Sequence, residues 1–278
     1  MQSRRDGFTL VELLIVLVLG SLVLGAVYQT VVTQQRATRQ TYAIIETQQN
    51  TRIGLELLAS DLREVSATDR DLIAAEANAI RYRAMRKAGI VCAKDGGGSW
   101  IDVAVIGEAF VRDDSVLIFN DGANPNSAID DTWMPARVTG VSSGSCPGFP
   151  GAAVINRLTT GLSLSTIQRG APVRSFTHTG YRLVDEAGGG VLYRMQGADS
   201  VVVLDGLRTV AQDGLRLMYW DTAGTAIPYA SLAGKLDEVG RIQIKLTGTA
   251  VGGGTGSARM FTDSLVTMVY LRGNRKIR

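Results

Sequence analysis

The chain has 278 residues, of which 45% are hydrophobic and 20% are charged, a mix typical of a folded globular protein and not of a disordered chain. Its net charge of +3 argues against a strong positive field that would recruit nucleic acid. A single histidine, His178, excludes polyhistidine metal sites and leaves little scope for histidine-based catalysis, and two cysteines are too few for a zinc knuckle.

The first predicted element is an apolar helix over Phe8–Tyr28, the most informative part of the sequence. A helix of this length spans about 31 Å, enough to cross the hydrocarbon core of a bilayer. Arg4 and Arg5 precede it. An excess of basic residues on a short flank places that end in the cytoplasm, so the rest of the chain is expected on the other side of the membrane.

A removable secretory signal peptide is the alternative interpretation of this segment. Such a signal needs small residues at its cleavage site. Cleavage after Ala26 would place Leu24 two residues earlier, and cleavage after Gly25 would place Val23 there. Neither position resembles the usual site, so the pattern favours a retained membrane helix.

Glu12 is the one ionisable residue of this segment before Tyr28. A carboxylate in a lipid-facing helix costs a few kcal/mol, less near an end than at the centre, and is therefore a functional hypothesis by default. Glu12 also lies about 6 Å of helix from Phe8. Two interpretations stay open on the residues alone: a functional carboxylate, or a side chain at the level of the lipid headgroups with no role.

Downstream, the pattern predicts that the helix continues to about Ser66. No proline occurs between residues 1 and 124. Residues at alternating spacings of four and three define one face, in which Gln48 and Thr51 are polar exceptions. The members of that face are Ile44, Gln48, Thr51, Leu55, Leu58, Leu62 and Val65. This face is expected to pack on a globular body.

After Ala67 the sequence predicts short strands separated by turn residues, in one body built around the helix. The hairpin signal is clearest around the glycines at 188–190. The expected strands are Ala79–Arg83, Trp100–Ile106, Ser115–Asn120, Ala136–Val141, Arg174–Val184, Val191–Met195, Val201–Leu204, Leu215–Trp220, Arg241–Leu246 and Ser264–Leu271. The expected fold class is α+β, with a long N-terminal helix, transmembrane in its first half, packed on a β-rich antiparallel head.

The charge argument places both cysteines, Cys92 and Cys146, outside the cytoplasm, where disulfides persist. A disulfide between them would close a loop of about 54 residues and stabilise the chain by roughly 4 kcal/mol in the chain-entropy model. Two free buried thiols are the alternative.

The run from Arg5 to Glu12 reads Arg-Asp-Gly-Phe-Thr-Leu-Val-Glu and resembles the leader and cleavage junction of type IV prepilins. The resemblance implies cleavage between Gly7 and Phe8 by a prepilin peptidase and N-methylation of the new Phe8 amine by the same enzyme. Glu12 would become the fifth residue of the mature chain, which that family uses for subunit registration. Gln29 stands where major pilins often have a kinking proline, which suits a minor component.

A weaker likeness in the C-terminal half points to PilW-like minor pilins or GspJ-like pseudopilins of type II secretion. It covers Val201–Asp221, Val239–Leu246 and Ser264–Gly273. The implied protein is not an enzyme, needs no cofactor or metal, and acts at the bacterial inner membrane. Its expected partners are other minor and major pilins or pseudopilins, the assembly platform and membrane lipid, with no nucleic acid. The implied domains are a leader at 1–7, a membrane helix at 8–28, a periplasmic helix at 29–66 and a head at 67–278.

Other chemistry is less well supported by the sequence. The Gly140–Gly144 run fits a nucleophile-elbow pattern around Ser142, but the residues that follow are poor helix formers, so a turn is expected. Acidic and amide side chains between Asp113 and Asp131 lack the spacing of a calcium loop, so a solvated loop is expected. A binding module at a filament tip, using loops 121–135 or 142–152, remains a rival function.

Overall fold

The N-terminal helix α1 runs from Leu10 to Arg63, 54 residues without a break. At 1.5 Å per residue its length is about 81 Å. The computed structural model describes residues 10–122, 130–147, 154–252 and 259–272. The helix passes Gln29 in regular geometry, as expected of a segment that lacks proline. It ends three residues before Ser66, the end predicted from the sequence.

The chain after α1 is built almost entirely of strands. These are β1 (Leu72–Ala75), β2 (Ala79–Lys94), β3 (Ile101–Ile106), β4 (Ser115–Asn120), β5 (Thr132–Ser143), β6 (Ile155–Thr160), β7 (Pro172–Glu186), β8 (Gly189–Gln196), β9 (Asp199–Leu207), β10 (Leu215–Asp221), β11 (Ala226–Ile227), β12 (Val239–Gly252) and β13 (Arg259–Tyr270). Short helical turns lie at Val210–Gln212, Tyr229–Leu232 and Leu236–Glu238. The predicted α+β class, a long apolar helix followed by an antiparallel sheet domain, is confirmed.

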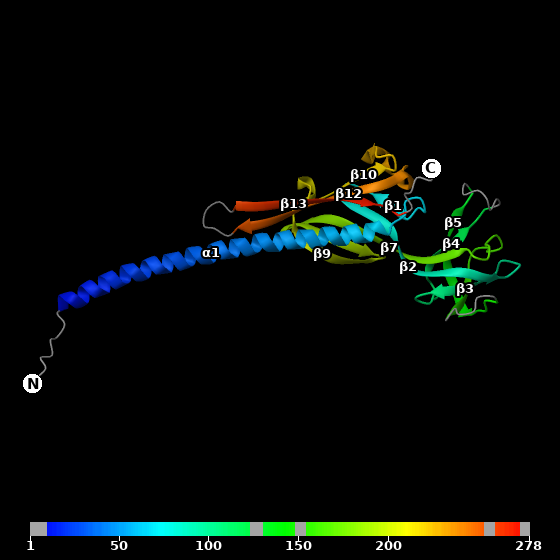
Figure 1. Cartoon of the computed structure of the whole chain (residues 1–278), viewed down its shortest axis with the longest axis horizontal. Coiled ribbons are helices and arrows are strands. Elements are labelled where there is room, and N and C mark those ends of the chain that lie inside the picture. The colour runs from blue at the N-terminus through cyan, green and yellow to red at the C-terminus, as the bar shows by residue number, and fades with distance from the viewer. Residues whose placement is uncertain (1–9, 123–129, 148–153, 253–258, 273–278) are drawn as a thin grey trace, which may run out of the picture.

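Every pairing between the named strands is antiparallel. The strand order is β1-β2-β3-β6-β5-β4-β7-β8-β9-β12-β10-β11, with β13 added to β12 and a further pairing of β2 with β7. Figure 1 shows the second half of α1 lying along the head, between the β12–β13 hairpin and β9. The first half of α1 extends away from the sheet.

Strands β2 and β7 are the longest pair and run through two lobes of the head (Figure 1). The proximal lobe has a core built by α1, β1, the first residues of β2 and strands β7–β13, which includes Leu58 and Leu62. The distal lobe has a separate core from β2–β7, which includes Ile101 and Leu158. The sequence predicted one body around the helix, whereas only the first of these two cores contains helix residues.

Each strand expected from the sequence is present, and several are longer than the apolar pattern indicated. The hairpin at residues 181–195 is confirmed by the register of β7 and β8, which pairs Glu186 with Gly189 across the turn. Gly189 has a φ of +131°, a conformation that side chains disfavour. Strands β1, β6 and β11 were not predicted. Strand β6 carries Asn156 and Arg157 next to each other, which interrupts the alternating pattern.

Candidate assembly surface

The first half of α1 is an exposed apolar surface. All side chains from Leu10 to Val31 are solvent-accessible, and the sheet does not cover them. Within the described residues, α1 is the one helix that is long and apolar enough to cross a membrane. Such a surface is stable against lipid or against other apolar protein surfaces, because exposure to water costs about 25 cal/mol per Å².

Glu12 lies in the first turn of α1 and is exposed in the isolated chain. A carboxylate there interacts favourably with the positive end of the helix dipole. Gly7 and Phe8, the predicted cleavage and methylation positions, lie outside the described residues. The structure therefore places one of the three predicted N-terminal site residues.

Three large apolar side chains of α1 beyond its first half are also exposed on the side away from the sheet. Tyr42, Ile53 and Leu57 are 68%, 64% and 37% exposed. Spacings of 11 and 4 residues return to nearly the same side of an α-helix. This outer stripe (Tyr42, Ile53 and Leu57) faces away from the side that packs on the sheet. Glu46 and Gln49 lie on the same side between Tyr42 and Ile53 and are exposed, so these three residues do not form a continuous apolar surface.

The side of α1 that packs on the sheet differs in part from the predicted face. Its buried members are Thr51, Gly54, Leu55, Leu58, Ala59 and Leu62. Gln48, assigned to this face from the sequence, is exposed. Thr51 is buried, and its hydroxyl is satisfied within the helix because it donates to the Thr47 carbonyl at 2.7 Å.

The close approach of helix and sheet depends on glycines. A Cβ on Gly54 would lie 2.7 Å from Leu204 Cδ2 of β9. A Cβ on Gly248 of β12 would lie 2.7 Å from Thr47 Cγ2 and would also meet the Thr51 hydroxyl. Because glycine has no side chain, α1 can pack closely against β9 and β12 at these two positions.

Near its C-terminal end, α1 is held by the carboxylate of Asp61. Its Oδ2 accepts hydrogen bonds from the hydroxyls of Tyr82 and Tyr181 at 3.1 and 2.7 Å. It also accepts one from Arg194 Nη2 at 2.9 Å. Burial, together with the Asp61 carboxylate, raises the pKa of both tyrosines above the usual value, so both hydroxyls stay protonated donors. Side chains from three strands, β2, β7 and β8, thus donate hydrogen bonds to one side chain of α1.

A buried ion pair connects the segment after α1 to the distal lobe. Asp71 Oδ1 and Oδ2 lie 2.9 and 3.2 Å from the guanidinium nitrogens of Arg174. The backbone N–H of Ser66 donates to the same carboxylate at 3.2 Å. Burial raises the pKa of Asp71, although Arg174 opposes the shift. Arg174 also stacks over Trp133 of β5, 4.3 Å from the ring centroid.

A disulfide joins Cys92 of β2 to Cys146 beyond β5, with the two Cα atoms 5.2 Å apart. The residue before Cys146 is held in place by Asp102, whose Oδ2 accepts a hydrogen bond from the Ser145 N–H at 3.1 Å. Arg157 makes two hydrogen bonds to the same carboxylate, at 2.8 and 2.9 Å. Burial alone would raise the pKa of Asp102, but the hydrogen bonds from Arg157 and Ser145 hold it below its usual value.

The residues considered for other chemistry are not assembled into a site within the described part of the chain. Ser142 lies inside strand β5, and residues 144–147 do not continue as the helix that a nucleophile elbow requires. Asp113 and Asp114 pair with Arg137 and Lys87, at 3.1 and 2.9 Å. Among the described residues, no three His, Cys, Asp or Glu side chains are placed to hold a metal.

The predicted loops of a tip binding module are shorter than expected. Strand β5 occupies residues 132–143, which includes parts of both segments. Residues 123–129 and 148–153 of these loops lie outside the described residues. His178 is exposed on β7, 5.5 Å from the ring of Phe176. Partial burial and the positive charges of Arg83 and Arg81 lower its pKa.

Comparison with known proteins bears on the N-terminal segment. Residues 2–28 match the family model described as the prokaryotic N-terminal methylation motif. The chain carries a prepilin-type N-terminus. No curated protein and no solved structure matches it.

The prepilin-type motif supports a type IV pilin-like or pseudopilin protein. It implies processing by a prepilin peptidase and assembly with other pilins. Together with the apolar half of α1, it fits an inner-membrane anchor. The family of proteins with this pilin-type motif is structural.

In this prepilin-type chain, the sequence did not predict that Asp61 would lie against Tyr82, Tyr181 and Arg194. The available signal was a lone acid inside the packing face, because Asp61 falls between Leu58 and Leu62. Its partners, from three different strands, are 21, 120 and 133 residues away along the chain. No local pattern indicates contacts at such separations.

Proposed function

We propose that the chain is a PilW-like minor pilin that supports assembly or initiation of a type IV pilus at the inner membrane. The observation that carries the proposal is a prepilin-type motif continuous with one unbroken helix. The first half of this helix is exposed and apolar, and its second half is docked in a β-rich head. A subunit of this form inserts in lipid first and then exchanges lipid for neighbouring helices.

In this proposal the leader of residues 1–7 is cytoplasmic, the head is periplasmic and the membrane helix spans from Phe8 to Tyr28. The prepilin peptidase cleaves after Gly7 and the enzyme's methyltransferase activity modifies the Phe8 amine. Gly7 suits the cleavage position because its backbone can approach a protease closely. Glu12 then directs docking on neighbouring pilins, and no cofactor or catalytic step is involved.

The first test is intact-mass analysis of the protein extracted from membranes. We expect a mature chain that begins at Phe8 with one added methyl group. Replacing Gly7 with a bulky residue should leave the precursor unprocessed. A mature chain that begins at any other residue would reject the prepilin assignment.

The second test separates the two filament systems, because a GspJ-like pseudopilin would share the leader, the anchor and the head. Deletion of the gene is expected to remove surface pili and twitching motility while exoprotein secretion continues. Loss of exoprotein secretion with pili intact would instead identify a pseudopilin. A deletion that leaves filaments intact but abolishes attachment would identify a tip binding module.

A further inference from the structure

Strand β13 is paired with another strand on one side only. It runs for 12 residues from Arg259 to Tyr270, and β12 pairs with it along this length without a register shift. Within the described residues, no strand pairs with its second side. That side, called the free edge of β13, therefore presents a row of backbone N–H and C=O groups for pairing.

Two hydrogen bonds just past β13 identify the groups at the free edge. The N–H of Leu271 donates to the Gly240 carbonyl of β12 at 3.1 Å. The next N–H, that of Arg272, points the opposite way and donates to the Val65 carbonyl at 2.9 Å. Because successive N–H groups of a strand point to opposite sides, those of the even-numbered residues of β13 point to the free edge. In the uncharged end of the strand these residues are Ser264, Val266, Met268 and Tyr270.

The free edge of β13 lacks the features that normally protect an edge strand. Natural edges are short, or carry proline, bulges or charged side chains. The two ends of the strand order, β1 and β11, have four and two residues. From residue 264 to residue 270, β13 has no proline, charge or bulge. Strand β9 pairs with β12 at a single position, but its register with β8 shifts twice, so its edge is irregular.

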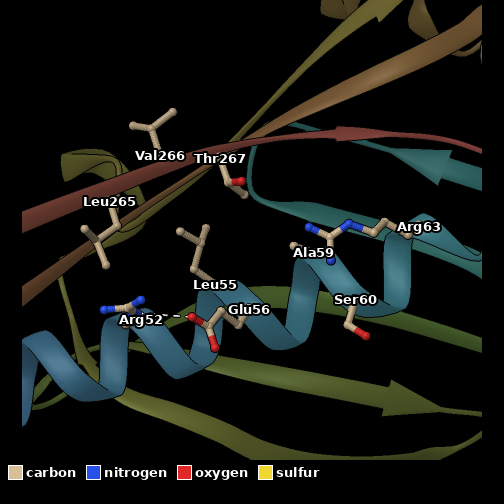
Figure 2. Close-up of a pocket in the computed structure, with 9 residues that line it drawn as sticks. All are labelled: Arg52, Leu55, Glu56, Ala59, Ser60, Arg63, Leu265, Val266 and Thr267. Atoms are coloured by element: carbon tan, nitrogen blue, oxygen red, sulfur yellow. Dashed lines mark hydrogen bonds and ion pairs between the residues drawn. The ribbon is translucent and has the colours of Figure 1, made fainter.

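The free edge borders a hollow of about 580 Å³ between β13 and α1. Figure 2 shows Leu55 directed toward β13 and Val266 directed away from the helix. Since side chains alternate along a strand, Leu265 lies on the helix side, where it lines the hollow with Leu55 and Ala59. The polar lining includes Arg52, Glu56 and Arg63 of α1. A strand added to the free edge would place every second side chain in this hollow.

Backbone chemistry decides what kind of partner can occupy the free edge. A second helix cannot pair with it, because the N–H and C=O groups along a helix are bonded to each other. Lipid is excluded by position, since Leu55 lies about 36 Å along the helix beyond Val31, where the exposed apolar half of α1 ends. An extended segment both continues the hydrogen-bonded ladder and fills the hollow.

We infer that the free edge of β13 pairs with a β-strand from the head of a neighbouring pilin-type subunit, which fills the hollow beside α1. The inference rests on the proposed function, in which the heads of neighbouring subunits lie side by side outside the membrane. Ser66 of the chain itself already bridges Arg272 at the end of this edge, so the edge accepts main-chain pairing. Because β13 runs alongside α1 (Figure 1), the register of the added strand would fix the height of one subunit relative to the next.

The first test is amide hydrogen exchange of the full-length chain, measured by mass spectrometry in detergent micelles and in isolated filaments. We expect the peptide that spans Ser264–Tyr270 to exchange at least tenfold more slowly in filaments. Strand β3 is the control, because β2 and β6 pair with it on both sides within the head. Unchanged exchange of the 264–270 peptide in filaments that contain the chain would overturn the inference.

The second test removes one N–H group from the free edge. Val266→Pro deletes a donor that points away from β12, so the pairing within the head is kept. Val266→Thr is the matched control, since threonine is also β-branched and keeps the N–H. A photoreactive phenylalanine derivative at Tyr270, which is 63% exposed, reports the contact in cells. We expect adducts with the head of a pilin-type subunit, reduced at least fivefold by Val266→Pro and retained in Val266→Thr.

Equal adduct yields in the two Val266 variants, or adducts that map to the partner's N-terminal helix, would overturn the inference. A separate probe at Leu17, in the exposed half of α1, reports entry into the filament. Adducts at Leu17 without slower exchange of the 264–270 peptide would reject only the strand pairing. No pilin-type adduct at Leu17 would reject the proposed function as well. Protease resistance of the head verifies the fold of each variant, and Met268→Pro with Met268→Leu replaces the first pair if Val266→Pro unfolds.

Discussion

The Asp61 carboxylate of α1 lies 2.7 Å from the hydroxyl of Tyr181 on β7, and this contact joins the helix to the centre of the sheet. Tyr82 and Arg194 donate to the same oxygen from the strands on either side. The helix is therefore joined to the sheet by this polar contact as well as by the apolar packing of Leu58 and Leu62.

Replacement of Asp61 by alanine should loosen this coupling. Hydrogen bonds to a charged acceptor contribute roughly 1.5–3 kcal/mol each, and Arg194 would be left without its partner, so we expect a loss of about 2–3 kcal/mol. Urea unfolding of the full chain in detergent micelles measures it. Glu56→Ala is the control on the same helix, since its exposed pair with Arg52 contributes at most about 1 kcal/mol. Equal effects of both substitutions would contradict the assigned role of Asp61.

Gly248→Ala should disturb the seat of α1 on β12. The added Cβ would meet Thr47 Cγ2 at 2.7 Å and would also meet the Thr51 hydroxyl. Both threonines are β-branched and stiff, so overpacking should cost about 1–3 kcal/mol. Gly161→Ala, with open space around its Cβ, serves as the control. Unchanged stability of the Gly248 variant would mean that helix and sheet separate more easily than this packing indicates.

The bond between Cys92 and Cys146 should be present in protein isolated from the envelope. Peptide mapping without reductant is expected to recover the linked peptides, and two alkylatable thiols would contradict the disulfide. Replacing both cysteines by alanine should lower the free energy of unfolding by up to about 4 kcal/mol. Because the distal core is separate from the core around α1, membrane anchoring should survive this change.

Stability should fall in acid partly through Asp102. Its pKa is lowered in the folded state, so its stabilising contribution is complete above the unfolded value of about 3.9 and is lost as the pH falls through the folded value. Asp102→Asn should therefore flatten the decline of unfolding free energy below about pH 4. Denaturant titrations at several pH values, for wild type and variant, measure the difference. Parallel curves would show that Asp102 does not contribute to the acid sensitivity.

Glu12→Ala should impair assembly and leave the head unchanged. After processing, the Phe8 amine and the Glu12 carboxylate would lie about 6 Å apart along one helix. A neighbour shifted along the filament could bring its amine closer, and the attraction is stronger in apolar surroundings. We expect normal membrane insertion and disulfide status, with cross-links to partner pilins and filament number reduced several-fold. Wild-type levels of both would reject the registration role and leave Glu12 as a headgroup-level residue.

Much of the architecture follows from local pattern. The missing prolines and the apolar run predict the long helix, and alternating residues such as those of Arg241–Leu246 predict strands. The motif around Gly7 and Phe8 is local as well, because a processing enzyme reads a short stretch of chain. These features depend on neighbours within a few residues, which is why a single sequence determines them.

The tertiary structure alone decided which side of α1 meets the head and what it meets there. Gln48 fitted the predicted face yet lies in water, while Gly54 packs against Leu204 of β9. Asp61 accepts hydrogen bonds from residues of three strands. The head has two separate cores, and strands β2 and β7 run from one lobe to the other. Such outcomes depend on contacts between residues far apart in the chain, whose geometry exists only once the helix has packed on the sheet.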